Sequence, residues 1–290
     1  VDDLKNWDII ETIGLTTDTQ LKITRFDNGV HQAESFQNGV RVRVSKQDTT
    51  DIYSWDEIST FYDPSGQVTA NVRHDDNGVE TITFFENGLR DRVEVSDTLD
   101  VANWDQRESY FDANGDRVAF VTTFDSGVQR VEQFENGVRT EIQERDLLDV
   151  KSWESIDTYY QDGERIARVT IADDGLETVE TFEGGMRDQT TQTDLGNTRN
   201  YESIETYFQN GERIARITEY DDGIIREEQY EDGIRTQIDQ TDTNDTKSWE
   251  KIETYYGETG VIIGKITTFD AGNVRTDYYP EGKRLVSEED

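Results

Sequence analysis

The amino-acid sequence has no cysteine, and only one methionine, two prolines and two histidines among its 290 residues. Without cysteine the chain can form no disulfide and offers no thiolate for catalysis or metal binding. The histidines, His31 and His74, lie in no metal-ligand motif. Neither a phosphate-binding glycine loop nor a nucleophile elbow is present. We therefore expect a protein that is not an enzyme.

Long apolar runs are also missing. No run reaches the ~18 apolar residues of a membrane span, and no signal peptide stands at the N-terminus. We therefore expect no membrane insertion, and we expect any export signal to lie outside this chain. The formal net charge of −35 repels nucleic acid, which excludes it as a partner. Apolar residues make up only 32%, yet 5 Trp, 13 Tyr and 12 Phe are present. This composition predicts a folded chain with a thin core.

The tryptophans recur at a regular spacing. They are Trp7, Trp55, Trp104, Trp153 and Trp249, with Tyr201 in the vacant position. A period of about 48 residues is typical of repeat architectures. We divide the chain, as a single repeat array, into six copies at approximately 4–52, 53–101, 102–150, 151–198, 199–246 and 247–290. The segment before Trp7 resembles the end of another inter-repeat loop, which favours a longer array.

Glycine marks the turns within each copy. One recurring phrase is FENGVR at 134–139, with its glycine at Gly39, Gly88, Gly137, Gly185, Gly233 and Gly282 in the six copies. A second turn carries Gly29, Gly78, Gly127, Gly175, Gly223 and Gly272, and a third turn occurs in five copies. Asn-Gly and Asp-Gly between short alternating runs indicate tight hairpins. Three turns give four strands per copy, so we predict an all-β protein of about 24 antiparallel strands.

Two architectures suit four-stranded units. A six-bladed β-propeller is favoured by apolar residues on both faces of the first two strands and by a longer fourth connection, such as 146–153, that could cross back over a blade. An open β-ribbon or spiral of hairpins is favoured by the low apolar content and by the absence of a leftover strand to close a ring. We expect the propeller, with the open ribbon as the alternative.

Two segments resemble known repeat families. The run from Tyr110, YFDANGDRVAFVTTFDSGVQRVEQFENGVR, resembles the tyrosine–aspartate (YD) hairpin repeats of bacterial toxin shells, which build spiralling antiparallel sheets. The unit from Asp146, DLLDVKSWESIDTYYQDGERIARV, resembles acidic tryptophan-containing repeats of large type I-secreted, calcium-associated proteins of the RTX kind. The RTX nonapeptide GGxGxDxxx is absent. The resemblance implies a segment of a secreted or surface, adhesin-like protein.

The recurring phrase ends in an arginine in every copy, at Arg41, Arg90, Arg139, Arg187, Arg235 and Arg284. These side chains could grip the anionic groups of a glycan. With 64 acidic residues in the chain, we instead expect each arginine to pair with an acidic neighbour or to stack on an aromatic ring.

Acidic pairs precede each aromatic of the repeat. They are Asp48 and Asp51, Asp97 and Asp100, Asp146 and Asp149, Asp194 and Asn197, and Asp242 and Asp245. Carboxylates three residues apart can supply oxygen ligands for calcium. The same spacing can also cap the amides of a turn, and we place capping ahead. The turn aspartates Asp27, Asp76, Asp125, Asp173, Asp221 and Asp270 could likewise ligate calcium, but Asx-turn capping is the better interpretation.

These features favour a non-enzymatic, extracellular or cell-surface structural and adhesion module with loosely bound calcium at its Asp-rich loops. Its expected partners are a cell-surface glycan or neighbouring repeats of a longer chain. Two alternatives are a glycan-binding, lectin-like propeller and a phage virion or tail-fibre component. We expect the recurring tryptophans to be core residues rather than a platform for sugars.

Overall fold

The computed structural model describes residues 6–14, 16, 18–280, 283–284 and 286–289. The chain forms two compact units, Val1–Val150 and Lys151–Asp290. Their boundary coincides with the sequence boundary between the third and fourth copies of the repeat. The described residues contain no α-helix, and none of them forms a helix long and apolar enough to cross a membrane.

The strands of the first unit are β1 (Trp7–Gly14), β2 (Thr19–Phe26), β3 (Val30–Gln37), β4 (Val40–Asp48), β5 (Trp55–Tyr62), β6 (Val68–Asp75), β7 (Val79–Glu86), β8 (Leu89–Asp97), β9 (Trp104–Phe111), β10 (Arg117–Phe124), β11 (Val128–Glu135) and β12 (Val138–Asp146). Those of the second unit are β13 (Trp153–Gln161), β14 (Glu164–Ala172), β15 (Leu176–Glu183), β16 (Met186–Asp194), β17 (Tyr201–Gln209), β18 (Glu212–Tyr220), β19 (Ile224–Glu231), β20 (Ile234–Asp242), β21 (Trp249–Tyr256), β22 (Ile262–Phe269), β23 (Val274–Tyr278) and β24 (Val286–Glu289). Each copy of the repeat therefore supplies four strands, as the sequence predicts.

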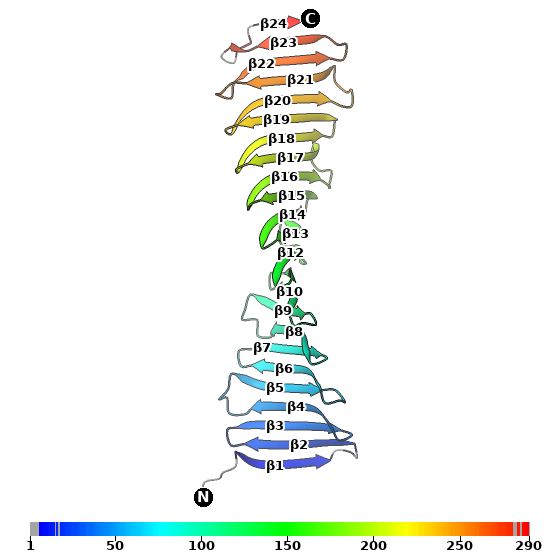
Figure 1. Cartoon of the computed structure of the whole chain (residues 1–290), viewed down its shortest axis with the longest axis vertical. Coiled ribbons are helices and arrows are strands. Elements are labelled where there is room, and N and C mark those ends of the chain that lie inside the picture. Colours follow the sequence, from blue (N-terminus) through cyan, green and yellow to red (C-terminus); the bar gives the residue numbers. More distant parts are fainter. Residues whose placement is uncertain (1–5, 15, 17, 281–282, 285, 290) are drawn as a thin grey trace. The chain divides into compact units, whose positions relative to one another are not determined.

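Within each unit, every strand pairs antiparallel with the strand before it and the strand after it in the chain (Figure 1). Among the described strands of a unit, contacts join only such neighbours. Each unit is thus a single-layer meander in which no second sheet covers either face. This explains the thin core: the buried apolar side chains of the described residues are only Val30, Trp104, Val128, Ile142, Ile156, Ile204, Ile224 and Ile238.

Pairing between copies shows that the propeller expectation is wrong. Blades of a propeller are separate sheets, so the fourth strand of one blade would not pair with the first strand of the next. Here β4 pairs with β5, from Arg43↔Phe61 to Gln47↔Glu57, and β8 pairs with β9. In the second unit β16 pairs with β17, and β20 with β21. The longer connection therefore links adjacent strands, and each unit matches the open-ribbon alternative.

The Asn-Gly phrase makes the predicted turn. Asn87 and Gly88 connect β7 to β8 with φ angles of 51° and 80°, and Glu86 pairs directly with Leu89 across them. Two central residues with positive φ define the type I′ hairpin, whose twist matches that of the flanking strands. The prediction is confirmed in the described copies; Gly282 lies outside the described residues.

The second turn has an additional role, because the connection between copies packs on its glycine. The Thr98 amide donates to the Gly78 carbonyl at 2.9 Å, and the Thr98 hydroxyl donates to the same oxygen at 2.6 Å. A Cβ on Gly78 would lie 2.2 Å from Leu99 Cγ. Equivalent backbone hydrogen bonds join Thr49 to Gly29 and Thr243 to Gly223. The Asp-rich loop of each of these copies is thus fixed on a turn of the same copy.

This contact predicts that Gly78→Ala destabilises the protein more than Gly88→Ala. Both glycines have a φ near +80°, so both changes incur the left-handed penalty of about 1–2 kcal/mol. Only Gly78 also has a neighbour in the space of the new methyl group, whereas a Cβ on Gly88 meets nothing within 4 Å. Overpacking adds about 1–3 kcal/mol. Urea unfolding followed by circular dichroism measures the difference; equal losses for the two variants would contradict the close approach.

The arginines that end the recurring phrase behave as predicted. Their stacking contacts, from Cζ to ring centroid, are Arg41 over Tyr62 at 4.6 Å, Arg90 over Phe111 at 4.7 Å, Arg187 over Phe208 at 4.6 Å and Arg235 over Tyr256 at 4.6 Å. Ion pairs join Arg41 to Glu34, Arg139 to Glu132, Arg187 to Glu180, Arg235 to Glu228 and Arg284 to Asp277. Except for Arg284, which lies between β23 and β24, each of these guanidinium groups ties one strand to its neighbour. This gives the arginines a structural role.

Candidate cation site

The first aspartate of each Asp-rich loop caps the loop. Asp48 Oδ2 accepts hydrogen bonds from the amides of Ile52 at 2.8 Å and Tyr53 at 2.6 Å. Asp97 accepts the Val101 amide at 2.8 Å and also the Ala102 amide. Asp194 and Asp242 bind the amides of Arg199 and Lys247 in the same way. The amide hydrogen bonds, that from Tyr53 foremost, lower the pKa of Asp48 despite partial desolvation. The predicted capping role is therefore confirmed in these four loops.

The second residue of each pair has a different backbone role. Asp51, Asp100, Asp149, Asn197 and Asp245 adopt φ angles of 57°, 53°, 54°, 49° and 54°. Asp and Asn tolerate this left-handed conformation better than other non-glycine residues. The recurrence of Asp-x-x-Asp is thus explained by one capping side chain and one left-handed backbone position. No calcium ligand is needed to account for it.

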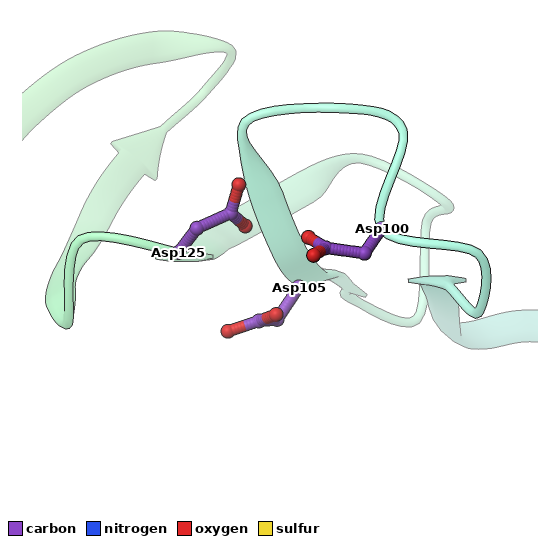
Figure 2. A group of neighbouring side chains, drawn as sticks. All are labelled: Asp100, Asp105 and Asp125. Atoms are coloured by element: carbon purple, nitrogen blue, oxygen red, sulfur yellow. The ribbon is translucent and has the colours of Figure 1, made fainter.

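The structure groups other carboxylates instead (Figure 2). Asp100 from the β8–β9 loop, Asp105 at the second position of β9 and Asp125 directly after β10 place carboxylate oxygens within 4.8 Å of one another. All three side chains are exposed. The antiparallel pairing of β9 with β10 causes this proximity, because Trp104 at the start of β9 lies opposite Phe124 at the end of β10.

Sequence reasoning missed Asp105. Its signal is an acidic residue directly after every repeat aromatic, at Asp8, Asp56, Asp105, Glu154, Glu202 and Glu250. Asp125, by contrast, was a candidate from its recurrence. In the corresponding turns of the first two copies, the residue after the turn aspartate caps the turn. Asn28 Oδ1 accepts the Val30 amide, and Asn77 Oδ1 accepts the Val79 amide. In the first two copies, the asparagine after the turn aspartate therefore makes this Asx hydrogen bond.

Desolvation and neighbouring negative charges raise the pKa of the turn aspartate in three copies. Desolvation raises the pKa of Asp125, and the negative charges of Asp100 and Asp105 raise it further. Desolvation likewise raises the pKa of Asp76, with further increases from the charges of Asp56 and Asp51. Desolvation also raises the pKa of Asp270, with further increases from Asp245, Asp242 and Glu250. A divalent cation among these oxygens would relieve the repulsion. Calcium takes about six to eight oxygen ligands, so three carboxylates leave most of its coordination to water and backbone and favour weak binding.

Two later loops carry a cation of their own. Arg199 Nη2 lies 2.5 Å from Asp174 Oδ2, and Lys247 Nζ lies 2.9 Å from Asp222 Oδ2. The same loop position holds Tyr53 in the second copy and Ala102 in the third. In the second and third copies, this position therefore supplies no positively charged side chain that would compete with a metal ion for the carboxylates. Asn197, at the end of the fourth copy, also replaces one carboxylate.

No protein-family description matches the sequence, and no curated protein matches it. Among solved structures, BamB from Moraxella catarrhalis is similar at 11% sequence identity and a TM-score of 0.16, over 94% of each chain. A similarity of this size carries no argument about the fold or the function of this chain.

Proposed function

We propose that this chain is a non-enzymatic structural and adhesion repeat module of a larger extracellular or cell-surface protein, with divalent cations bound loosely along its acidic loops. The observation that carries the proposal is the continuous strand pairing from one copy to the next within each unit. Such pairing lets copies be added without altering those already present, which suits a spacer. The resemblance to YD and RTX-type repeats supports placement outside the cell.

The cation part of the proposal rests on one group of three carboxylates, Asp100, Asp105 and Asp125, which we name the acidic triad. The corresponding sequence positions hold Asp51, Asp56 and Asp76 one copy earlier, and Asp245, Glu250 and Asp270 near the C-terminal end. The triad joins the β8–β9 loop to β9 and to the end of β10. A cation there would hold the loop against the sheet and lower the local negative charge. Since a ligand that binds only the folded state stabilises it, calcium should stabilise the protein.

We expect millimolar calcium to raise the unfolding temperature of the wild-type chain and to raise it less in Asp100→Asn/Asp125→Asn. Binding at a concentration about 100 times Kd adds about 2.7 kcal/mol for one site, and weak sites add less. The matched control is Asp221→Asn in the fifth copy, where Asn197 already takes the place of one carboxylate; its calcium response should equal that of the wild type. Thermal unfolding by circular dichroism measures each response.

Two results would overturn the cation proposal. One is a wild-type unfolding temperature that does not change with calcium. The other is the same increase on adding sodium chloride at matched ionic strength, because general screening of the −35 net charge would then explain the effect. A calcium response that is lost equally in the Asp221→Asn control would also contradict a role for the triad.

A further inference from the structure

A group of arginines lines a hollow on β18–β20 in the second unit. Figure 1 shows these three neighbouring strands. Arg213, Arg216, Arg226 and Arg235 line a hollow of about 280 Å³, and Glu228 is the only acidic residue among its lining residues. Four guanidinium groups against one carboxylate leave an excess of positive charge. In a chain with a net charge of −35, such a local excess requires an explanation.

Strand register explains how these side chains come together. Arg216 pairs with Glu228 across β18 and β19, and Thr218 pairs with Arg226 in the adjacent same-face row. Paired residues of an antiparallel sheet share a face. The next residues along these two rows, on β17 and β20, are uncharged: Thr206, Ile238, Ile204 and Gln240. The rows therefore bring no further carboxylate to this part of the face.

The single carboxylate is already fully engaged. Glu228 Oε1 lies 2.7 Å from Arg226 Nη2 and 2.8 Å from Arg235 Nη1, and its Oε2 accepts the Tyr230 hydroxyl at 3.0 Å. Arg213 stacks on the Tyr230 ring, with Cζ 3.9 Å from the centroid. Glu228 thus neutralises two of the arginines only in part and makes no ion pair with the other two.

Arg216 differs from the other three arginines in having neither an ion pair with Glu228 nor a stacking contact with Tyr230. It forms no ion pair with any residue that the structure describes, and its Nε is buried without a hydrogen-bond partner. The Nε atoms of Arg226 and Arg235 are also buried and unpartnered. Buried donors without partners are costly. The uncompensated positive charge that lines the hollow would attract an anion, and the guanidinium fork suits the oxygens of a tetrahedral oxoanion.

We propose that this hollow binds the sulfate or phosphate monoester group of a small polar ligand. The net charge of −35 disfavours extended polyanions, so a single charged group on a compact ligand fits best. Thr218 and the rings of Tyr220 and Tyr230 also line the hollow, which provides a hydroxyl and aromatic surface for a sugar ring carrying the ester. This site is independent of the cation binding proposed above.

The preceding copy offers a matched control. Its corresponding register positions hold Arg168, which pairs with Glu180, and Thr178, which pairs with Thr170 and takes the place of Arg226. That copy therefore has one cation fewer around its central glutamate. Arg168→Gln and Arg216→Gln remove the same side chain from the same position of the repeat, but only Arg216 lines the hollow described here.

The test is isothermal titration of the complete chain with glucose 6-sulfate and with glucose 6-phosphate, at an ionic strength of about 0.15 M, where the Debye length is about 8 Å. We expect saturable binding of at least one ester at one site. Arg216→Gln should weaken it about tenfold, as expected for the loss of a charge-assisted hydrogen bond, and Arg168→Gln should leave it unchanged. The preferred ester distinguishes a sulfate site from a phosphate site.

Arg216→Lys provides a second variant in case the glutamine variant does not fold. It keeps the charge but loses the fork, so we expect a smaller loss of affinity than for Arg216→Gln. Absence of binding by both esters would overturn the proposal. Equal losses in Arg168→Gln and Arg216→Gln would also overturn it, because diffuse attraction would then replace a specific site. Unchanged affinity in both Arg216 variants would have the same consequence.

Discussion

Trp104→Ala should lower the free energy of unfolding of its unit by about 3–5 kcal/mol, the usual cost of removing a buried aromatic side chain. Trp104 is the most buried residue of its series, with 8% of its surface exposed. The Arg107 guanidinium covers its ring, with Cζ 4.3 Å from the centroid. In a single-layer sheet few side chains are buried, so each contributes a large share of the stability. Urea unfolding followed by far-ultraviolet circular dichroism measures the loss.

The matched control is Trp55→Ala in the second copy. Trp55 is half-buried and stacks on Tyr53, with ring centroids 5.4 Å apart. Less of its apolar surface is buried, so we expect Trp55→Ala to lower the free energy of unfolding less than Trp104→Ala does. A near-neutral effect of Trp104→Ala would show that the tryptophan is a surface platform. Equal effects at the two positions would show that burial does not determine the cost.

The strands and hairpins could be predicted from the sequence because their signals are local. Asn87-Gly88 requires two residues with positive φ, and few other dipeptides allow this. The choice between propeller and ribbon had no such signal. Whether the strand after Asp97 returns across a blade or pairs beside β8 is decided by backbone hydrogen bonds, which every sequence offers equally. The low apolar content was the better guide, since a single layer has little interior to fill.

The candidate site was harder to predict, because residues that are close in sequence do not share a role in it. Asp97 and Asp100 are close in the chain, yet Asp97 binds loop amides while Asp100 lies beside Asp105 and Asp125. The last of these comes from the far end of the next strand. Its position follows only once β9 and β10 are paired in register. The arginine hollow was hidden for the same reason, since Arg216 and Arg226 meet through strand pairing rather than through a motif.

Glu228→Gln should destabilise the second unit by about 1.5–3 kcal/mol, the range for hydrogen bonds to charged groups. Glu228 is 6% exposed. It forms ion pairs with Arg226 and Arg235 and accepts a hydrogen bond from the Tyr230 hydroxyl. Glutamine has almost the same shape but leaves both guanidinium groups without their counter-charge, which is costly at a site of low exposure. Glu227→Gln is the control, because that exposed neighbour has its side chain on the opposite face of the strand; it should be close to neutral.

The pH dependence of this difference separates charge from packing. Burial acts to raise the pKa of Glu228, but hydrogen bonds from Arg235 and Tyr230 and the charge of Arg226 outweigh it and hold the pKa below its ordinary value of 4.5. The stabilisation from a lowered pKa is complete above the pKa of the unfolded chain and is lost as pH falls through the folded value. The advantage of wild type over Glu228→Gln should therefore persist at neutral pH and shrink as the pH falls below that ordinary value toward the lowered pKa of Glu228. An advantage that stays constant into acid would show that packing, not the carboxylate charge, stabilises this part of the sheet.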